Sequence, residues 1–233
     1  ALERGARRED LLTPHDQTAP GQKRSDEWWQ IYEAPYEEQY HSTRFVTERT
    51  QQFIKESCEG DQPWMALCSY PDPHHPMCPP GPWFDRHSTD DMPLPQSRHD
   101  PLEHAPAHLR LFQGVHPSKQ RDWVAPCGFG NDRLLSQAIA ATYGMIEMVD
   151  EGVGQILRQL EELGVRDNTI IVFTSDHGDM MGDHGLFLKG FMHYRGTLQV
   201  PLIIDAPGMP ALRSYGLSSS IDIAPTLLEL CSL

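Results

Sequence analysis

The chain has 233 residues and a formal net charge of −14 at neutral pH, and 39% of its residues are hydrophobic. This length allows one substantial core or a large part of a longer domain. The acidic balance argues against nucleic acid as a partner, because phosphate backbones are bound by clustered Lys and Arg. No apolar run approaches the roughly 20 residues that span a bilayer, so we expect no membrane span.

Both ends of the sequence have the composition of a chain interior. Residues 1–10 contain neither an initiating Met nor the apolar region of a signal peptide, and the last residues, 227–233, are mostly apolar. We therefore expect a fragment of a longer chain. The five cysteines are odd in number and form no C-x-x-C pair, which argues against a disulfide framework or a structural zinc site. Unpaired thiols favour a cytoplasmic over a periplasmic or secreted location, and nothing in the sequence specifies an oligomeric state.

The first predicted elements are a loop and a helix. Residues 1–35 contain three prolines and no long apolar period, so we expect mostly loop, anchored to a core by two adjacent tryptophans. From Glu37 to Cys58 apolar residues recur roughly at helical spacing, which predicts an amphipathic helix. Ser42 or Thr43 is the expected N-cap, and Gly60 the expected stop.

A strand and a long loop are expected next. Residues 64–70 form a continuous apolar run between two prolines, which predicts a central strand of a covered sheet. Residues 71–131 are rich in Pro and His. Because an irregular stretch of this length is uncommon in a compact domain, we expect it to be functional and to shape the substrate side. A short helical turn is expected around Ala105–Gln113.

The strongest helical signal runs from Asp132 to Leu163. Asn131 or Asp132 can cap this helix, and Gly164 is placed to end it. The remaining predicted elements are two strands and a helix, at Thr169–Thr174, Val200–Asp205 and Ile221–Leu230. Asp222 is the expected N-cap of the last helix. Alternating helices and strands predict an α/β fold in which helices sandwich a mainly parallel, or mixed, sheet.

Polar side chains follow the strand predicted at Thr169–Thr174. Ligands of open α/β sheets bind beyond the carboxyl ends of strands, and there the sequence reads S-D-H-G. Asp176 and His177 are side chains that a divalent cation accepts, and Gly178 permits tight backbone geometry. A lone D-H-G is more often a capped turn. Five further titratable residues follow within twenty positions: Asp179, Asp183, His184, Lys189 and His193. That concentration favours a site over packing material.

A second polar cluster, P-D-P-H-H-P, follows the strand predicted at residues 64–70. The prolines stiffen this loop and can aim His74, His75 or both. The alternative is that the prolines only end the strand and leave both imidazoles in solvent. Taken alone, the sequence does not favour either interpretation.

Together these segments resemble the sulfatase family of the alkaline-phosphatase superfamily. The resemblance lies in Thr174–Gly178, Gly182–Gly185 and Lys189, in the P-H-x-P loop at Pro73–Pro76, in Val200–Ile204 with Pro207 and Gly208, and in Ser220–Leu228. The ordered set is far more specific than any one piece. It implies that residues 1–233 are part of a single sulfatase-type catalytic domain, in which 132–233 form the metal-site half.

The resemblance also implies a role for each candidate residue. Asp176 and His177 would be metal ligands, usually for calcium in this family, and Lys189 would contact the sulfate and the leaving oxygen. His74 would contact the substrate and protonate the leaving group, and His75 could share or replace that role. This chemistry suits an anionic ester, which needs charge neutralisation and an acid for the departing oxygen.

His184, in the second D-H-G, is expected to shape the loop. Arg195 stands where the family's H-Y-E-G pattern has an acidic residue. Sulfatases also carry a C-x-[PS]-x-R nucleophile, whose Cys is oxidised to formylglycine, and two metal-binding acids on the first strand. Neither feature occurs here, so we expect both upstream and no turnover by the 233-residue chain alone.

The leading hypothesis is a sulfatase that cleaves a sulfate monoester of a small molecule or carbohydrate. Two alternatives stay open: a phosphonate monoester or phosphodiester hydrolase of the same superfamily, and a non-catalytic sulfatase-like protein. A weaker alternative is a zinc hydrolase that uses His74, His75, His177 and His184.

Overall fold

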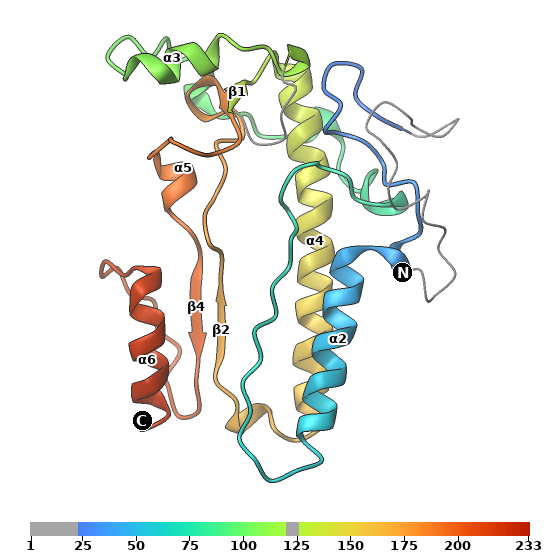
Figure 1. The fold of residues 1–233 in the computed structure, drawn as a ribbon, viewed down its shortest axis with the longest axis vertical. Coiled ribbons are helices and arrows are strands. Elements are labelled where there is room, and N and C mark those ends of the chain that lie inside the picture. The colour runs from blue at the N-terminus through green and yellow to red at the C-terminus, as the bar shows by residue number, and fades with distance from the viewer. Residues whose placement is uncertain (1–22, 120–125) are drawn as a thin grey trace.

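The structure is a computed structural model that describes residues 23–119 and 126–233 (Figure 1). The first 22 residues of the loop predicted at 1–35 lie outside the described residues. Its remainder is loop with isolated bridges, and Trp28 anchors it as expected. The Trp28 side chain is 1% exposed, and its ring stacks on Phe187 with the centroids 4.9 Å apart.

The longest helix, α4 (Asp132–Glu162), forms one wall of the main core. Its apolar stripe buries Leu134, Leu135, Ala138, Ile139 and Met145. The predicted caps are confirmed, because the Asn131 side chain accepts the Leu134 N–H at 2.9 Å and Gly164 follows the helix with φ of 69°. This helix is therefore specified locally at both ends and along its buried face.

Helix α2 (Ser42–Ser57) packs along α4 (Figure 1). The predicted N-cap is wrong: His41 caps the helix, and its Nδ1 accepts the Thr43 N–H at 3.3 Å. The Thr43 hydroxyl is used elsewhere, because it donates to Asp72, a residue 29 positions away. A long-range contact thus displaces the locally expected cap.

The described strands form two antiparallel pairs. They are β1 (Cys127–Gly128) with β3 (Leu186–Phe187), and β2 (Ile171–Thr174) with β4 (Leu202–Asp205). In the second pair Ile171 lies opposite Asp205 and Thr174 opposite Leu202. The α/β composition agrees with the prediction. The mainly parallel pairing is not confirmed, because both ladders of the described residues are antiparallel.

Residues 64–70 are extended but belong to no ladder of the described chain. The side chains of Met65 and Leu67 are 78% and 86% exposed, so the expectation of a covered central strand is wrong for this structure. The segment runs in the same direction as β2, from the lower to the upper end of the view (Figure 1). The apolar pattern indicates a strand, whereas its burial depends on neighbours that are distant in the sequence.

The long loop at 71–131 contains α3 (Ala107–Gln113), as expected, together with short 3-10 turns; residues 120–125 lie outside the described part. Helix α5 (Arg195–Leu198) lies between β3 and β4, and α6 (Ile223–Leu230) follows β4. Asp222 precedes α6 but makes no side-chain cap to it. Instead its carboxylate accepts the Ser219 N–H at 2.8 Å in a preceding turn. Among the described helices, none is long and apolar enough to cross a membrane.

Candidate functional site

Asp176 and His177 lie together where the chain leaves β2. The preceding Thr174 pairs with Leu202 of β4, and its hydroxyl donates to the carbonyl of Pro201, just before that strand, at 2.9 Å. The His177 N–H donates to Asp176 Oδ1 at 2.9 Å, and His177 Nε2 lies 3.4 Å from Asp176 Oδ2. The carboxylate is 83% exposed and the imidazole 42% exposed. The predicted ligand pair therefore converges at the surface.

The His177 ring is held in the orientation that a metal ligand needs. Its Nδ1 lies 2.9 Å from the Gly178 carbonyl oxygen, so Nδ1 carries the proton that is donated there. That tautomer leaves the Nε2 lone pair beside the Asp176 carboxylate. Metal-binding histidines usually make such a bond through their other nitrogen.

The charge state of Asp176 also suits a cation. Partial burial acts to raise the pKa of this carboxyl, but the His177 N–H, the nearby imidazole and the Ser175 hydroxyl together lower it below its ordinary value. The residues present thus fit two ligands of a divalent cation. Calcium takes six to eight oxygen ligands, so further ligands are needed.

Gly178 is required by close backbone packing. Its N–H donates to the Thr197 carbonyl at 2.9 Å, which ties the ligand loop to α5. A Cβ on residue 178 would lie 2.0 Å from the Gly196 carbonyl oxygen. Arg195, where the family pattern has an acid, bonds to Gln199, the residue that ends its own helix. Arg195, although it replaces the family's acidic residue, therefore leaves the contact between Gly178 and Thr197 in place.

Lys189 follows the buried strand β3 with only Leu188 between them. Phe187 and Leu188 are fully buried in the main core, and the Leu188 carbonyl accepts the Met180 N–H at 2.9 Å. The core thereby fixes the position from which the half-buried Lys189 side chain starts. Burial holds the pKa of this ammonium below its ordinary value, and the carboxylates of Asp179 and Asp176 offset part of that effect.

Asp179 is a site residue to which the sequence assigned no role. Burial raises the pKa of its carboxyl, while the Met181 N–H, 3.0 Å from Oδ1, and the charge of Lys189 act to lower it. Asp179 therefore lies between the ligand pair and Lys189 in the electrostatic network. Its position directly after D-H-G was visible in the sequence, but its surroundings depend on the backbone of Met181 and Leu188.

His74 and His75 occupy different environments. The side chain of His75 is buried, at 5% exposed, whereas His74 is exposed and stacks on it with ring centroids 4.0 Å apart. His74 Nδ1 lies 2.6 Å from the His75 carbonyl oxygen, so Nδ1 donates there and Nε2 faces outward. The hydrogen bonds and ring contacts of His74 stay within its own loop, so no direct bond joins it to Asp176 among the described residues.

The two candidate loops nevertheless follow segments of the same direction. Residues 64–70 and β2 both run from the lower toward the upper end of Figure 1, and the loops at 71–76 and 175–189 follow them in the chain. Ligand sites of α/β sheets lie at such carboxyl ends. That both loops belong to one site stays a prediction.

His184 is held in a network of its own. Its Nδ1 lies 2.7 Å from Asp100 Oδ2, and its ring stacks on Tyr194 with centroids 4.1 Å apart. The Gln113 side chain donates to its carbonyl at 3.0 Å. These contacts agree with the expectation that His184 shapes the loop.

The zinc alternative receives no geometric support. Within residues 23–119 and 126–233 there is no group of three or more His, Cys, Asp or Glu side chains that could hold a metal ion. The histidines of that hypothesis are therefore not gathered around one point. The five cysteines carry free thiols.

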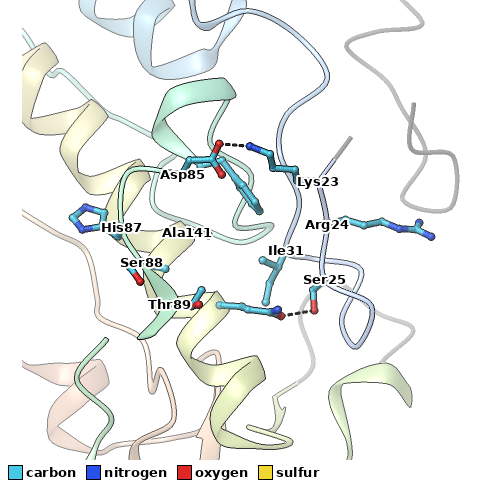
Figure 2. A pocket seen from close by; sticks show the side chains of 12 residues that line it. Lys23, Arg24, Ser25, Ile31, Asp85, His87, Ser88, Thr89 and Ala141 are labelled. Carbon is cyan, nitrogen blue, oxygen red and sulfur yellow. Dashed lines mark hydrogen bonds and ion pairs between the residues drawn. The ribbon is translucent and has the colours of Figure 1, made fainter. Parts of the chain in front are cut away.

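A pocket of about 370 Å³ lies elsewhere, between residues 23–31, residues 84–89 and α4 (Figure 2). Lys23 forms an ion pair with Asp85 at its edge, and the Ser25 hydroxyl donates to Gln137 at 2.8 Å. None of the sequence-predicted site residues lines it. Lys23 and Asp85 pair with each other there, and the predicted site residues lie elsewhere, so the candidate site is the surface formed by the Asp176–Lys189 loop.

Comparison with known proteins shows the family of the chain. The family model described as Sulfatase matches residues 13–233, so the chain belongs to the sulfatase family. The chain is 34% identical over 201 residues to an arylsulfatase of Clostridium perfringens, covering 83% of this chain and 39% of that protein.

Two solved structures are similar. The phosphonate monoester hydrolase of Agrobacterium radiobacter has a TM-score of 0.64 and 29% identity over 76% of this chain and 35% of its own. The phosphonate monoester hydrolase of Silicibacter pomeroyi has a TM-score of 0.74 and 24% identity, with 99% of this chain and 45% of that one covered; it supports the fold alone. This chain thus spans less than half the length of these proteins.

Proposed function

We propose that the protein is a sulfuric ester hydrolase. This chain contributes half of its metal site, Lys189 as a substrate-binding residue and His74 as the general acid. The observation that carries this proposal is the Asp176–His177 pair, whose oxygen and Nε2 lie 3.4 Å apart at the end of β2. The Nδ1 bond to Gly178 leaves the His177 lone pair free for a cation. Membership of the sulfatase family supports the reaction class.

Each residue has a separate task. Asp176 and His177 hold a divalent cation, which we propose to be Ca²⁺ and which, when bound, neutralises charge on the sulfate oxygens. Lys189 contacts the sulfate and the leaving oxygen, where its ammonium stabilises developing negative charge. His74 acts in its imidazolium form: the Nε2 proton goes to the leaving oxygen, while the Nδ1 proton stays bonded to the His75 carbonyl and the ring is left neutral.

His75 supports His74 in this proposal. Its ring is buried while that of His74 is exposed, so His75 provides the surface on which the acid stacks. The nucleophile, a formylglycine, and the remaining metal ligands are proposed to lie outside these 233 residues. The chain would then form part of a single catalytic domain, with residues 71–131 on the substrate side.

We also propose that the complete sheet is mainly parallel. Residues 64–70 support this, because they are extended, apolar and aligned in direction with β2 (Figure 1). The proposed substrate is a sulfate monoester of a small molecule or carbohydrate, and similarity to an arylsulfatase supports an aryl ester as the first to test. A cytoplasmic location remains a proposal from the free thiols.

A second candidate function is hydrolysis of phosphonate monoesters. The similarity to the Agrobacterium radiobacter enzyme favours it, at a TM-score of 0.64 and 29% identity. Both reactions transfer an anionic tetrahedral group from an ester oxygen, so the same cation, Lys and acid serve either.

The test compares para-nitrophenyl esters of sulfate, phenylphosphonate and a phosphodiester. The protein is expressed from its whole gene and assayed with Ca²⁺, and Lys189→Ala serves as the site control. Because all three substrates release the same leaving group, differences in kcat/KM report on the transferred group. We expect sulfate to be preferred and K189A to lose that activity.

A preference for the phosphonate or phosphodiester would replace the sulfatase proposal with the second candidate. No turnover of any ester by calcium-loaded protein would support a non-catalytic relative. Full activity of K189A would show that the reaction occurs elsewhere.

A further inference from the structure

Asp72 is a buried carboxylate directly before the His74–His75 loop. Its side chain is 8% exposed, and its Oδ2 accepts the hydroxyl of Thr43 from the first turn of α2. His41 Nδ1 lies 3.4 Å from the same oxygen. Burial of a carboxylate is costly unless it is hydrogen-bonded, so this contact is a specific feature of the fold.

The partner of Asp72 is the N-terminus of a 16-residue helix. His41 is 3% exposed, and its Nδ1 accepts the Thr43 N–H, so this nitrogen carries a lone pair toward the helix. The Thr43 hydroxyl is therefore the donor that reaches Asp72. The positive end of the α2 dipole further favours a carboxylate at this place.

The loop that carries the proposed acid is fixed on both sides. Before it, Asp72 is bound to α2, and the His74 N–H donates to the Pro71 carbonyl at 3.1 Å. After it, the Met77 N–H donates to the Gln30 carbonyl at 2.7 Å, and Met77 is 1% exposed. Between these points His74 stays exposed, with its ring orientation set by His75.

We propose that Asp72, bound by Thr43 at the start of α2, is a positioning residue that sets the place of His74 Nε2 relative to the ester oxygen. The inference rests on the proposed role of His74. It adds that α2, far from the metal loop in the sequence, determines the geometry of proton delivery. Displacing a catalytic group by roughly 1 Å can cost about a hundredfold in rate, so this hydrogen bond affects catalysis without touching substrate.

The structure provides a matched control. Thr47 lies one turn after Thr43 in α2, is 1% exposed, and its hydroxyl bonds to the Thr43 carbonyl and to the Tyr70 hydroxyl at 2.9 Å and 3.0 Å. Thr43→Val and Thr47→Val therefore remove the same hydroxyl from the same buried helix face. Only T43V removes the donor to Asp72.

The experiment measures turnover of two sulfate esters by the protein expressed from its whole gene. Phenyl sulfate has a more basic leaving group than para-nitrophenyl sulfate and so depends more on the acid. We expect T43V and Asp72→Asn to lower kcat about tenfold or more on phenyl sulfate and no more than about threefold on para-nitrophenyl sulfate. T47V should change kcat on both esters by the same factor. Thr43→Ser, which keeps the hydroxyl, should show the wild-type ratio of the two kcat values.

His74→Ala separates the two proposals. If H74A shows no selective loss on phenyl sulfate, the acid role of His74 is wrong, and the positioning role falls with it. If H74A shows that loss while T43V and D72N keep the wild-type ratio, as T47V does, only the positioning inference is overturned. Should D72N fail to fold, T43V and T43S decide the question.

Discussion

Gly178→Ala tests whether the contact between the ligand loop and α5 determines the metal geometry. A Cβ at this position would lie 2.0 Å from the Gly196 carbonyl oxygen, whereas real Cβ contacts stay beyond 3.0 Å. The two backbones must therefore separate by at least the difference, 1.0 Å. That movement also stretches the 2.9 Å bond from the Gly178 N–H to Thr197.

The expected cost follows from overpacking and the weakened hydrogen bond. Inserting a methyl group into a packed contact costs about 1–3 kcal/mol, and a typical hydrogen bond contributes about 1 kcal/mol. We expect G178A to lower the free energy of unfolding by about 1–3 kcal/mol, because relaxation spreads the clash over both segments. Since Asp176 and His177 immediately precede the displaced residue, Ca²⁺ affinity and kcat/KM should fall by about a hundredfold.

Gly60→Ala is the matched control, because a Cβ at Gly60 meets nothing within 4 Å and its φ is not positive. Urea denaturation, calorimetric Ca²⁺ titration and hydrolysis of para-nitrophenyl sulfate are measured on both variants of the protein expressed from its whole gene. G60A should match the wild type in metal affinity and turnover. A G178A protein that binds Ca²⁺ and turns over as G60A does would refute the proposed dependence of the site on α5.

Three further predictions concern charged side chains. Asp176→Asn should weaken Ca²⁺ binding by about tenfold or more while leaving the urea midpoint in EDTA unchanged, because the exposed carboxylate contributes mainly to the cation. Lys189→Ala should lower kcat/KM by about a hundredfold or more at unchanged Ca²⁺ affinity, if the ammonium contacts the sulfate as proposed and is not a metal ligand; equal loss of both would contradict that role. The Leu102 N–H, and next the His184 side chain, hold the pKa of Asp100 below its ordinary value. The stabilising contribution of Asp100 is thus present above about pH 4 and disappears as the pH falls through the folded-state pKa. The difference in free energy of unfolding between the wild type and Asp100→Asn should therefore become smaller in acid.

Elements with local signals were predicted correctly from the sequence. The helix α4 combines a regular apolar stripe with Asn131 before it and Gly164 after it, and all three features act within a few residues. The strands β2 and β4 and the turn that became α3 were found for the same reason. The predicted N-cap of α2 was wrong. The hydroxyl of Thr43 bonds to distant Asp72, and His41 caps the helix instead.

In the candidate site, too, local features were predicted from the sequence and long-range ones were not. Asp176 and His177 are adjacent in the chain, so their convergence needed only a turn after a strand, and the motif revealed it. The sequence left the roles of His74 and His75 open. The structure separates them by burial, which depends on what packs around the loop rather than on the loop's own residues.

The sequence by itself therefore determined the family, and it predicted the Asp176–His177 pair, Lys189, most helices and the strands β2 and β4, because these depend on short-range patterns and ordered motifs. Tertiary structure alone decided what positions them. Gly178 is constrained by Gly196, Lys189 by the buried strand β3, and Asp72 by α2. Each of these contacts joins segments that are separate in the chain, and no local residue preference specifies such a contact.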